Sequence, residues 1–323
     1  MDNVKSNLPY VAITGLFIIG NSIINLPLSK YPQGVVIGFL LSVILGLVFI
    51  IIALKKSDRI FSSKLSISVL VTYSLFCALV TVRNFITFSD RVLLTEAKTI
   101  IPSLLFITLL YIFCRANKNV ILKISTVSFA VITITSLLFF ILNLPNISFN
   151  YLIKINEIDL KGVIYEALAF LLLSFIQSII LIYFLKNNIK KHSVLTGYFY
   201  AVLILSICLI QTIGIFGTAL TGQLLNPYAS SVSIISLGDK FLRLEGFSYF
   251  LYFAATLIKS AVCLAVGKDA IGKIKEEAEK YFLPVACSIL SVFCVFTNVF
   301  KNVEFMYIIP LLLIPPVVLI LKK

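Results

Sequence analysis

Two ionisable side chains, Glu166 and Lys259, lie inside long apolar stretches of this sequence. A charged group in the hydrocarbon core of a bilayer is costly, so it is usually paired, placed in a wet cavity or used for function. Such a residue can carry a proton, bind a charged ligand or form an ion pair. Snorkelling toward the membrane surface is the alternative for both residues. It is the better interpretation of Arg83, which lies only five residues before Phe88.

Small and polar residues gather in the middle of the first apolar stretch, which contains Gly20-Asn21-Ser22. Transporters of the inverted-repeat type interrupt a helix at such a place, and the freed backbone groups bind the substrate or ion. We therefore expect Thr14, Gly20, Asn21 and Ser22 to contribute to a ligand site. Close helix packing through small residues is the alternative.

Further polar side chains lie in two other apolar stretches. Tyr73, in the third stretch, can line a central cavity, and Ser174 and Gln177 lie in the sixth. The sixth stretch is the expected counterpart of the first in a five-plus-five repeat. No glycine follows Gly162 within it, so whether this helix is also broken stays open.

Motifs for enzyme chemistry are missing or incomplete. The segment Gly267–Lys273 matches most of a phosphate-binding loop, but Ile274 stands where Ser or Thr must bind magnesium, and no strand precedes it. We interpret this segment as a short cytoplasmic loop. The single histidine, His192, lies in a basic loop, and no metal-ligand set or nucleophile–base arrangement is present. We therefore expect no catalytic residue, metal or cofactor.

The elements that must position these side chains are membrane-spanning helices. Hydrophobic residues make up 60% of the chain and charged residues only 13%, whereas a soluble domain has roughly a quarter charged residues. The apolar residues form blocks of the length that a bilayer requires of a helix. We expect an all-α protein with about ten spans, the fourth starting earlier within 92–98. The spans are 9–28, 34–54, 65–88, 100–113, 120–142, 162–185, 194–217, 246–266, 282–300 and 305–321.

The basic residues predict the topology. Ten spans with both termini in the cytoplasm place 17 of the 27 lysines and arginines inside and 8 outside, which agrees with the positive-inside rule. This distribution also accounts for the net charge of +13. No basic arm with interleaved aromatic residues is present, so we expect no nucleic-acid partner. Two outside segments are long. The second half of one of them, 233–245, has the apolar pattern of a short amphipathic helix that lies along the membrane surface.

One stretch of the sequence resembles a known family. Asn226-Pro227-Tyr228, followed by the run from Ser233 to Glu245, is similar to the spore germination permeases, the B subunits of nutrient-germinant receptors. That family shows a Gly-Asp turn, then Arg-Leu-Glu opening an eighth span with an internal lysine, here Lys259. The first span also resembles the family, since Leu26-Pro27 follows Gly20 at the expected distance.

The resemblance implies a place in the amino acid–polyamine–organocation superfamily, whose fold is two inverted five-helix repeats with a site at the first and sixth spans. The repeats would cover roughly 8–143 and 162–300, with the last helix at 305–321. It also implies residence in the spore inner membrane and two partner subunits, a larger membrane subunit and a lipoprotein. Two departures are visible. Ser174-Phe175-Ile176-Gln177 replaces the family's small-Phe-Gly-Glu pattern, and the tryptophan of the eighth span is missing.

These observations together predict a germinant-sensing, transporter-like subunit that binds a small nutrient such as an amino acid. In related transporters a sodium ion lies between the first and eighth spans, so Lys259 is expected to replace it with a fixed positive charge. A proton-coupled amino acid permease, with Glu166 or Lys259 titrating, is the second hypothesis. A membrane scaffold with a vestigial site is the third.

Overall fold

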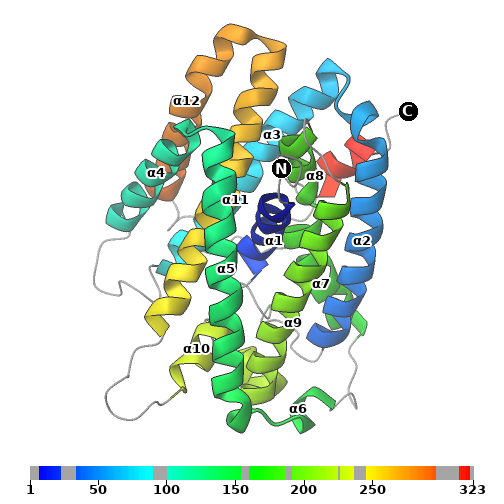
Figure 1. Ribbon diagram of the computed structural model, residues 1–323, viewed down its shortest axis with the longest axis vertical. Coiled ribbons are helices and arrows are strands. Elements are labelled where there is room, and N and C mark those ends of the chain that lie inside the picture. The colour runs from blue at the N-terminus through cyan, green and yellow to red at the C-terminus, as the bar shows by residue number, and fades with distance from the viewer. Residues whose placement is uncertain are drawn as a thin grey trace, which may run out of the picture.

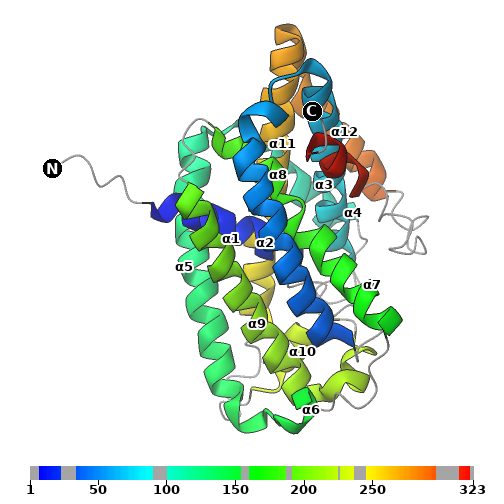
Figure 2. The same ribbon diagram turned by 90° about the vertical axis from the view of Figure 1, so that its right-hand side faces the viewer.

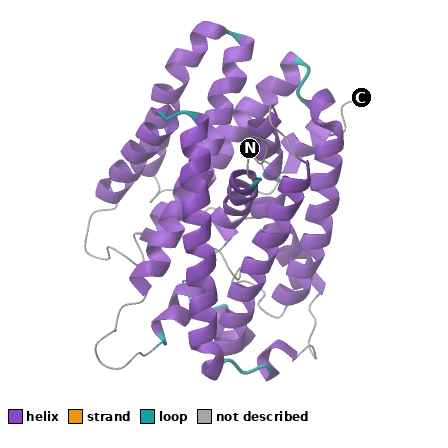
Figure 3. Ribbon diagram, viewed as in Figure 1, coloured by secondary structure: helices purple, strands orange, loops and turns teal. Residues whose placement is uncertain are grey.

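The described residues of the computed structural model are almost entirely helical, with short turns and loops between the helices (Figure 3), as the apolar blocks predict. It describes residues 7–22, 34–89, 100–153, 160–186, 191–224, 226–235, 245–295 and 313–320. No strand occurs within these ranges. A helix satisfies all of its backbone hydrogen bonds internally, which is what a segment in lipid requires.

The helices follow the predicted spans closely over the first eight. They are α1 (Leu8–Ser22), α2 (Val35–Ile60), α3 (Lys64–Phe88), α4 (Ile100–Arg115), α5 (Lys118–Asn143), α6 (Asn150–Ile153), α7 (Leu160–Phe170), the π-helical segment η4 (Leu171–Phe175), α8 (Ser178–Leu185), α9 (Lys191–Thr221), α10 (Pro227–Ser233), α11 (Glu245–Ile274) and α12 (Glu276–Val295). Residues 313–320 are also helical. The proposed early start of the fourth span and the ends of the first, ninth and tenth lie outside the described residues.

Within the described residues, six segments are long and apolar enough to cross a bilayer, so the chain is a multi-pass membrane protein. They are 35–60, 64–88, 118–146, 160–185, 191–221 and 246–274. Large apolar side chains are exposed along α2, α4 and α5, for example Ile44, Leu105 and Val127. Such side chains on an outer surface suit contact with lipid.

The first helix is enclosed by the others. Residues 11–20 of α1 are all buried, against α5, α9, α11 and η4. Figure 1 looks nearly along α1, and Figure 2 shows that it runs across the bundle, steeply inclined to the long helices. Because protein surrounds this helix, its small and polar residues do not face lipid.

Glycines allow two close helix contacts. A methyl group added at Gly38 of α2 would lie 2.8 Å from Cβ of Glu166, and one at Gly34 would lie 2.5 Å from the backbone of Val163. Gly34 and Gly38 form a small-xxx-small pattern that lets the backbones of α2 and α7 approach. In the same way, Gly197 of α9 contacts Thr14 of α1.

Of the connections that the structure describes, those predicted to lie inside gather at one end of the bundle and those predicted to lie outside at the other (Figure 1). At one end lie the α2–α3, α4–α5 and α11–α12 connections with the end of α8, where Lys186 is stacked over Phe61. At the other end, Asn143 donates a 3.0 Å hydrogen bond to the carbonyl of Ser231 on α10. This arrangement agrees with the alternation that the basic residues predict.

One local prediction is wrong. The segment Gly267–Lys273 is not a loop, because it forms the last turns of α11. The predicted surface helix at 233–245 falls mostly outside the described residues. Helix α10 ends at Ser233 and Ile234–Ile235 are not helical, while 236–244 lies outside the described residues. Asn226 begins α10 instead, since its side chain accepts from the amide of Ala229 at 3.1 Å and Pro227 follows it.

Candidate functional site

The sixth predicted span is interrupted at its centre. Helix α7 passes into η4, then into a turn at 176–177, before α8 continues to Leu185. The amide of Ile176 donates to the carbonyl of Leu171 at 2.9 Å, which is the i to i−5 spacing of a π-helix. Such a segment departs from the α-helical ladder and often marks a functional site. All five residues of η4 are buried.

Lys259 of α11 reaches into this interruption. Its amino group donates a 2.8 Å hydrogen bond to the carbonyl oxygen of Leu173, and the side chain is completely buried. The same amino group lies 5.2 Å from the centre of the Phe17 ring on α1, a cation–π distance. The Lys259 side chain therefore does not snorkel toward the membrane surface. The lysine joins three elements, α11, η4 and α1.

Gly20 makes room for the lysine on α1. A methyl group added there would lie 3.0 Å from the carbonyl oxygen of Ala255 and 3.1 Å from Cβ and Cδ of Lys259. A larger residue at this position would have to displace α11 or the lysine. The glycine therefore acts through close packing in the part of α1 that the structure describes.

The end of α1 also contacts η4 directly. The hydroxyl groups of Ser22 and Ser174 are hydrogen-bonded to each other, and Ser22 also donates to the carbonyl of Ile18 at 3.2 Å. Both serines are buried. Ser22 therefore lies next to the interruption of the sixth span, while the break after Gly20 stays a prediction. The side chain of Asn21 and residues 23–33 lie outside the described part of the chain.

Two further predicted residues are buried with unused hydrogen-bonding groups. Both the oxygen and the nitrogen of the Gln177 amide lack a hydrogen bond within the described residues, as does the hydroxyl of Tyr73. Gln177 lies in the turn that ends η4. Tyr73 lies on α3, one helical turn before the buried Cys77. Unpaired buried polar groups are costly, so these side chains suit a bound polar ligand or water.

Two predicted residues lie elsewhere. Thr14 packs against Gly197 of α9, and its hydroxyl donates to the carbonyl of Tyr10 at 2.7 Å within its own helix. Glu166 is completely buried on α7 against Gly38 of α2, before the interruption begins. The Glu166 side chain therefore does not snorkel to the membrane surface, and it lies among different residues from those around Lys259.

The site also contains groups that the sequence reasoning did not name. The carbonyl of Leu173 carries no sequence signal, because every residue has such an acceptor. Phe17 could have been found, since it lies one turn before Gly20 on the same helix. The assembled groups can bind a carboxylate through an amine and an ammonium through backbone carbonyls. Among the described residues, no three His, Cys, Asp or Glu side chains lie together as metal ligands would.

Comparison with known proteins gives one family match. Residues 55–306 match the family model described as spore germination protein. The match includes η4, Gln177 and Lys259, while α1 precedes it. No curated protein matches the chain.

Proposed function

The chain belongs to the spore germination protein family, and on this premise we propose that it is the membrane subunit of a nutrient-germinant receptor. In this proposal it senses a small zwitterionic nutrient, such as an amino acid. The nutrient binds at the junction of α1, η4 and α11. It is recognised by the charges at its two ends.

The bond between Lys259 and the Leu173 carbonyl carries this proposal. A neutral carbonyl leaves the charge of a buried lysine without a counter-charge, and a buried charge is costly unless it is paired. A nutrient carboxylate would therefore replace the carbonyl as the acceptor of the lysine. The carbonyl would then be free to accept a hydrogen bond from the nutrient's ammonium group.

The remaining polar groups support recognition of such a ligand. The Gln177 amide can donate to one part of the nutrient and accept from another, and Tyr73 can donate from α3. Ser22, Ser174 and Asn21 complete the proposed set. Lys259 takes the role of the sodium ion that related transporters hold between the first and eighth spans. The protein would then respond to nutrient without sodium.

The wider arrangement belongs to the same proposal. About ten helices form two inverted repeats, over roughly 8–143 and 162–300, with both termini in the cytoplasm and the protein in the spore inner membrane. The partners are a larger membrane subunit and a lipoprotein. Nutrient binding changes the contact between α1 and η4, and the partners detect that change. Glu166, buried on α7 against Gly38 of α2, is proposed as a charge-pairing residue.

The test is nutrient binding to the purified full-length protein in lipid nanodiscs. A panel of amino acids is screened by thermal shift, and hits are measured by calorimetry. We expect Lys259→Met to weaken binding by on the order of tenfold or more, the value of a charge-assisted hydrogen bond. Ser260→Ala is the matched control, because Ser260 is the buried neighbour whose hydroxyl lacks a hydrogen bond in the described structure.

Unchanged nutrient binding and folding in Lys259→Met would refute the proposed role of the lysine. Uptake of the same labelled amino acid into proteoliposomes then separates sensing from transport. A receptor subunit binds without net flux, whereas sustained accumulation would identify a permease.

A further inference from the structure

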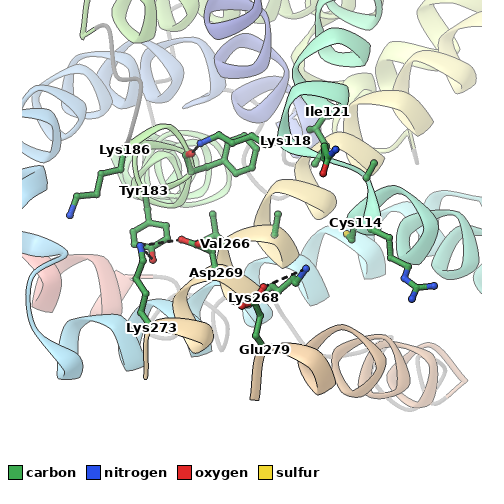
Figure 4. A pocket seen from close by; sticks show the side chains of 15 residues that line it. Cys114, Lys118, Ile121, Tyr183, Lys186, Val266, Lys268, Asp269, Lys273 and Glu279 are labelled. Carbon is green, nitrogen blue, oxygen red and sulfur yellow. Dashed lines mark hydrogen bonds and ion pairs between the residues drawn. The ribbon is translucent and has the colours of Figure 1, made fainter. Parts of the chain in front are cut away.

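A cavity of about 320 Å³ lies at the end of the bundle where the predicted cytoplasmic segments meet (Figure 4). It is formed by the turn between α4 and α5, the end of α8, the last turns of α11 and the start of α12. This volume is at the lower end of the range for small-molecule sites. The cavity is separate from the proposed nutrient site.

The lining of this cavity is strongly basic. Five cationic side chains border it against two acidic ones. The cations are Arg115, Lys118, Lys186, Lys268 and Lys273, and the acids are Asp269 and Glu279. The like charges gathered around this cavity repel one another and attract an anion.

Both acidic side chains already have partners. Lys273 pairs with Asp269 at 3.2 Å and also donates to the Tyr183 hydroxyl at 2.8 Å. Lys268 pairs with Glu279 at 3.6 Å. Figure 4 shows both pairs on the α11 side of the cavity. Arg115, Lys118 and Lys186 remain without a carboxylate partner among the described residues.

Lys118 is the most informative of these cations. It is half-buried at the start of α5, and its amino group donates to the carbonyl of Phe184 and lies 4.5 Å from the Phe184 ring centre. The positive-inside rule accounts for exposed basic residues in loops, but it does not require a lysine to be partly desolvated. A half-buried ammonium with no carboxylate suits a site that binds an anion.

The anion would be held by side chains. The phosphate-loop-like segment Gly267–Lys273 is α-helical, so its backbone amides are engaged in the helix and cannot surround a phosphate. Its Lys268 and Lys273 nevertheless line the cavity, as do Arg115, Lys118 and Lys186 from the other elements around it. We propose that this cavity binds a phosphate group, carried by an anionic lipid headgroup or by a soluble phosphate.

Two arms of one experiment separate these sources. The full-length protein is delipidated and reconstituted in phosphatidylcholine nanodiscs. Phosphatidylglycerol is added in one arm, and inorganic phosphate, against chloride at equal ionic strength, in the other. The thermal unfolding midpoint is measured in both, and retained phospholipid is measured by native mass spectrometry. Lys118→Gln is compared with Lys123→Gln, an equal charge change at an exposed position of the same helix.

We expect a rise of the midpoint in wild type and Lys123→Gln that is lost in Lys118→Gln, with affinity weakened on the order of tenfold. A rise confined to the phosphatidylglycerol arm identifies a lipid headgroup, and a rise with inorganic phosphate identifies a soluble ligand. Equal shifts in all three proteins, or no shift in either arm, would overturn the proposal. If Lys118→Gln does not fold, Arg115→Gln provides the same comparison.

Discussion

Ser22, at the described end of α1, shares a hydrogen bond with Ser174 inside the π-helical segment, although 152 residues separate them in the chain. The bond links the two elements between which the nutrient is proposed to bind. We expect Ser22→Ala and Ser174→Ala each to lower stability and the double variant to lose less than their sum. The coupling should be about 0.5–1.5 kcal/mol, measured by chemical unfolding in detergent. Strict additivity would show that the serines do not interact.

Gly20 is expected to tolerate no side chain. A methyl group there must push away Lys259 or the backbone of α11, which lie 3.0–3.1 Å from it. Gly20→Ala should cost about 1–3 kcal/mol of stability and weaken nutrient binding. Gly246→Ala is the control, because nothing lies within 4 Å of its added methyl group. Thermal unfolding and nutrient titration measure both effects, and a Gly20→Ala protein identical to the control would contradict the packing argument.

Gln177 is expected to matter for binding and not for stability. Both polar atoms of its buried amide are unpaired in the described structure, so replacing it by leucine removes no hydrogen bond. Gln177→Leu should therefore fold at least as stably as wild type but respond poorly to nutrient.

The matched variant is Gln211→Leu. The Gln211 amide donates to the hydroxyl of Ser231 at 2.9 Å, so this change should be less stable than Gln177→Leu by about 1 kcal/mol. Nutrient binding should persist in the folded Gln211→Leu protein. The reverse pattern, with Gln177→Leu unstable and still responsive, would mean that Gln177 is structural.

The orientation in the membrane can be tested by cysteine labelling. Lys275 and Gln223 are exposed at opposite ends of the bundle, and the five native cysteines whose side chains are described are buried. Intact cells should label Gln223→Cys with an impermeant maleimide, and Lys275→Cys should label only after permeabilisation. The unmodified chain measures background. The opposite labelling would reverse the proposed topology.

Much of this fold is predictable because lipid imposes simple rules. Apolar length located the long helices between α2 and α11 but not the short α6 and α10, and the charge distribution predicted which of the described connections share an end of the bundle. The boundaries differ where polar residues extend a helix beyond the apolar block, as at Lys268 and Lys273 in α11. The start of α10 had a readable signal in Asn226 and Pro227, namely an N-cap residue followed by proline.

The candidate site was less predictable. Lys259, Ser22 and Gln177 stood out because polar residues are rare in apolar segments. The interruption at η4 had no glycine to mark it, since a π-helical turn depends on neighbouring contacts more than on local sequence. The acceptor for Lys259 is a backbone carbonyl, which no residue type reveals. Thr14 was expected to bind the ligand because it is polar, but its hydroxyl donates to the backbone of its own helix. Threonine often does this inside a helix, so a polar residue type alone does not identify a site residue.

The enclosed position of α1 has a consequence for biogenesis. This helix is synthesised before α5, α9 and α11, which cover its buried surface, and α11 ends at Ile274. The nascent α1 must therefore wait, held at the insertion machinery or in a temporary contact, until α11 has emerged. Chains that stop before α11 would leave Phe17 and Gly20 uncovered, which gives membrane quality control a surface to recognise.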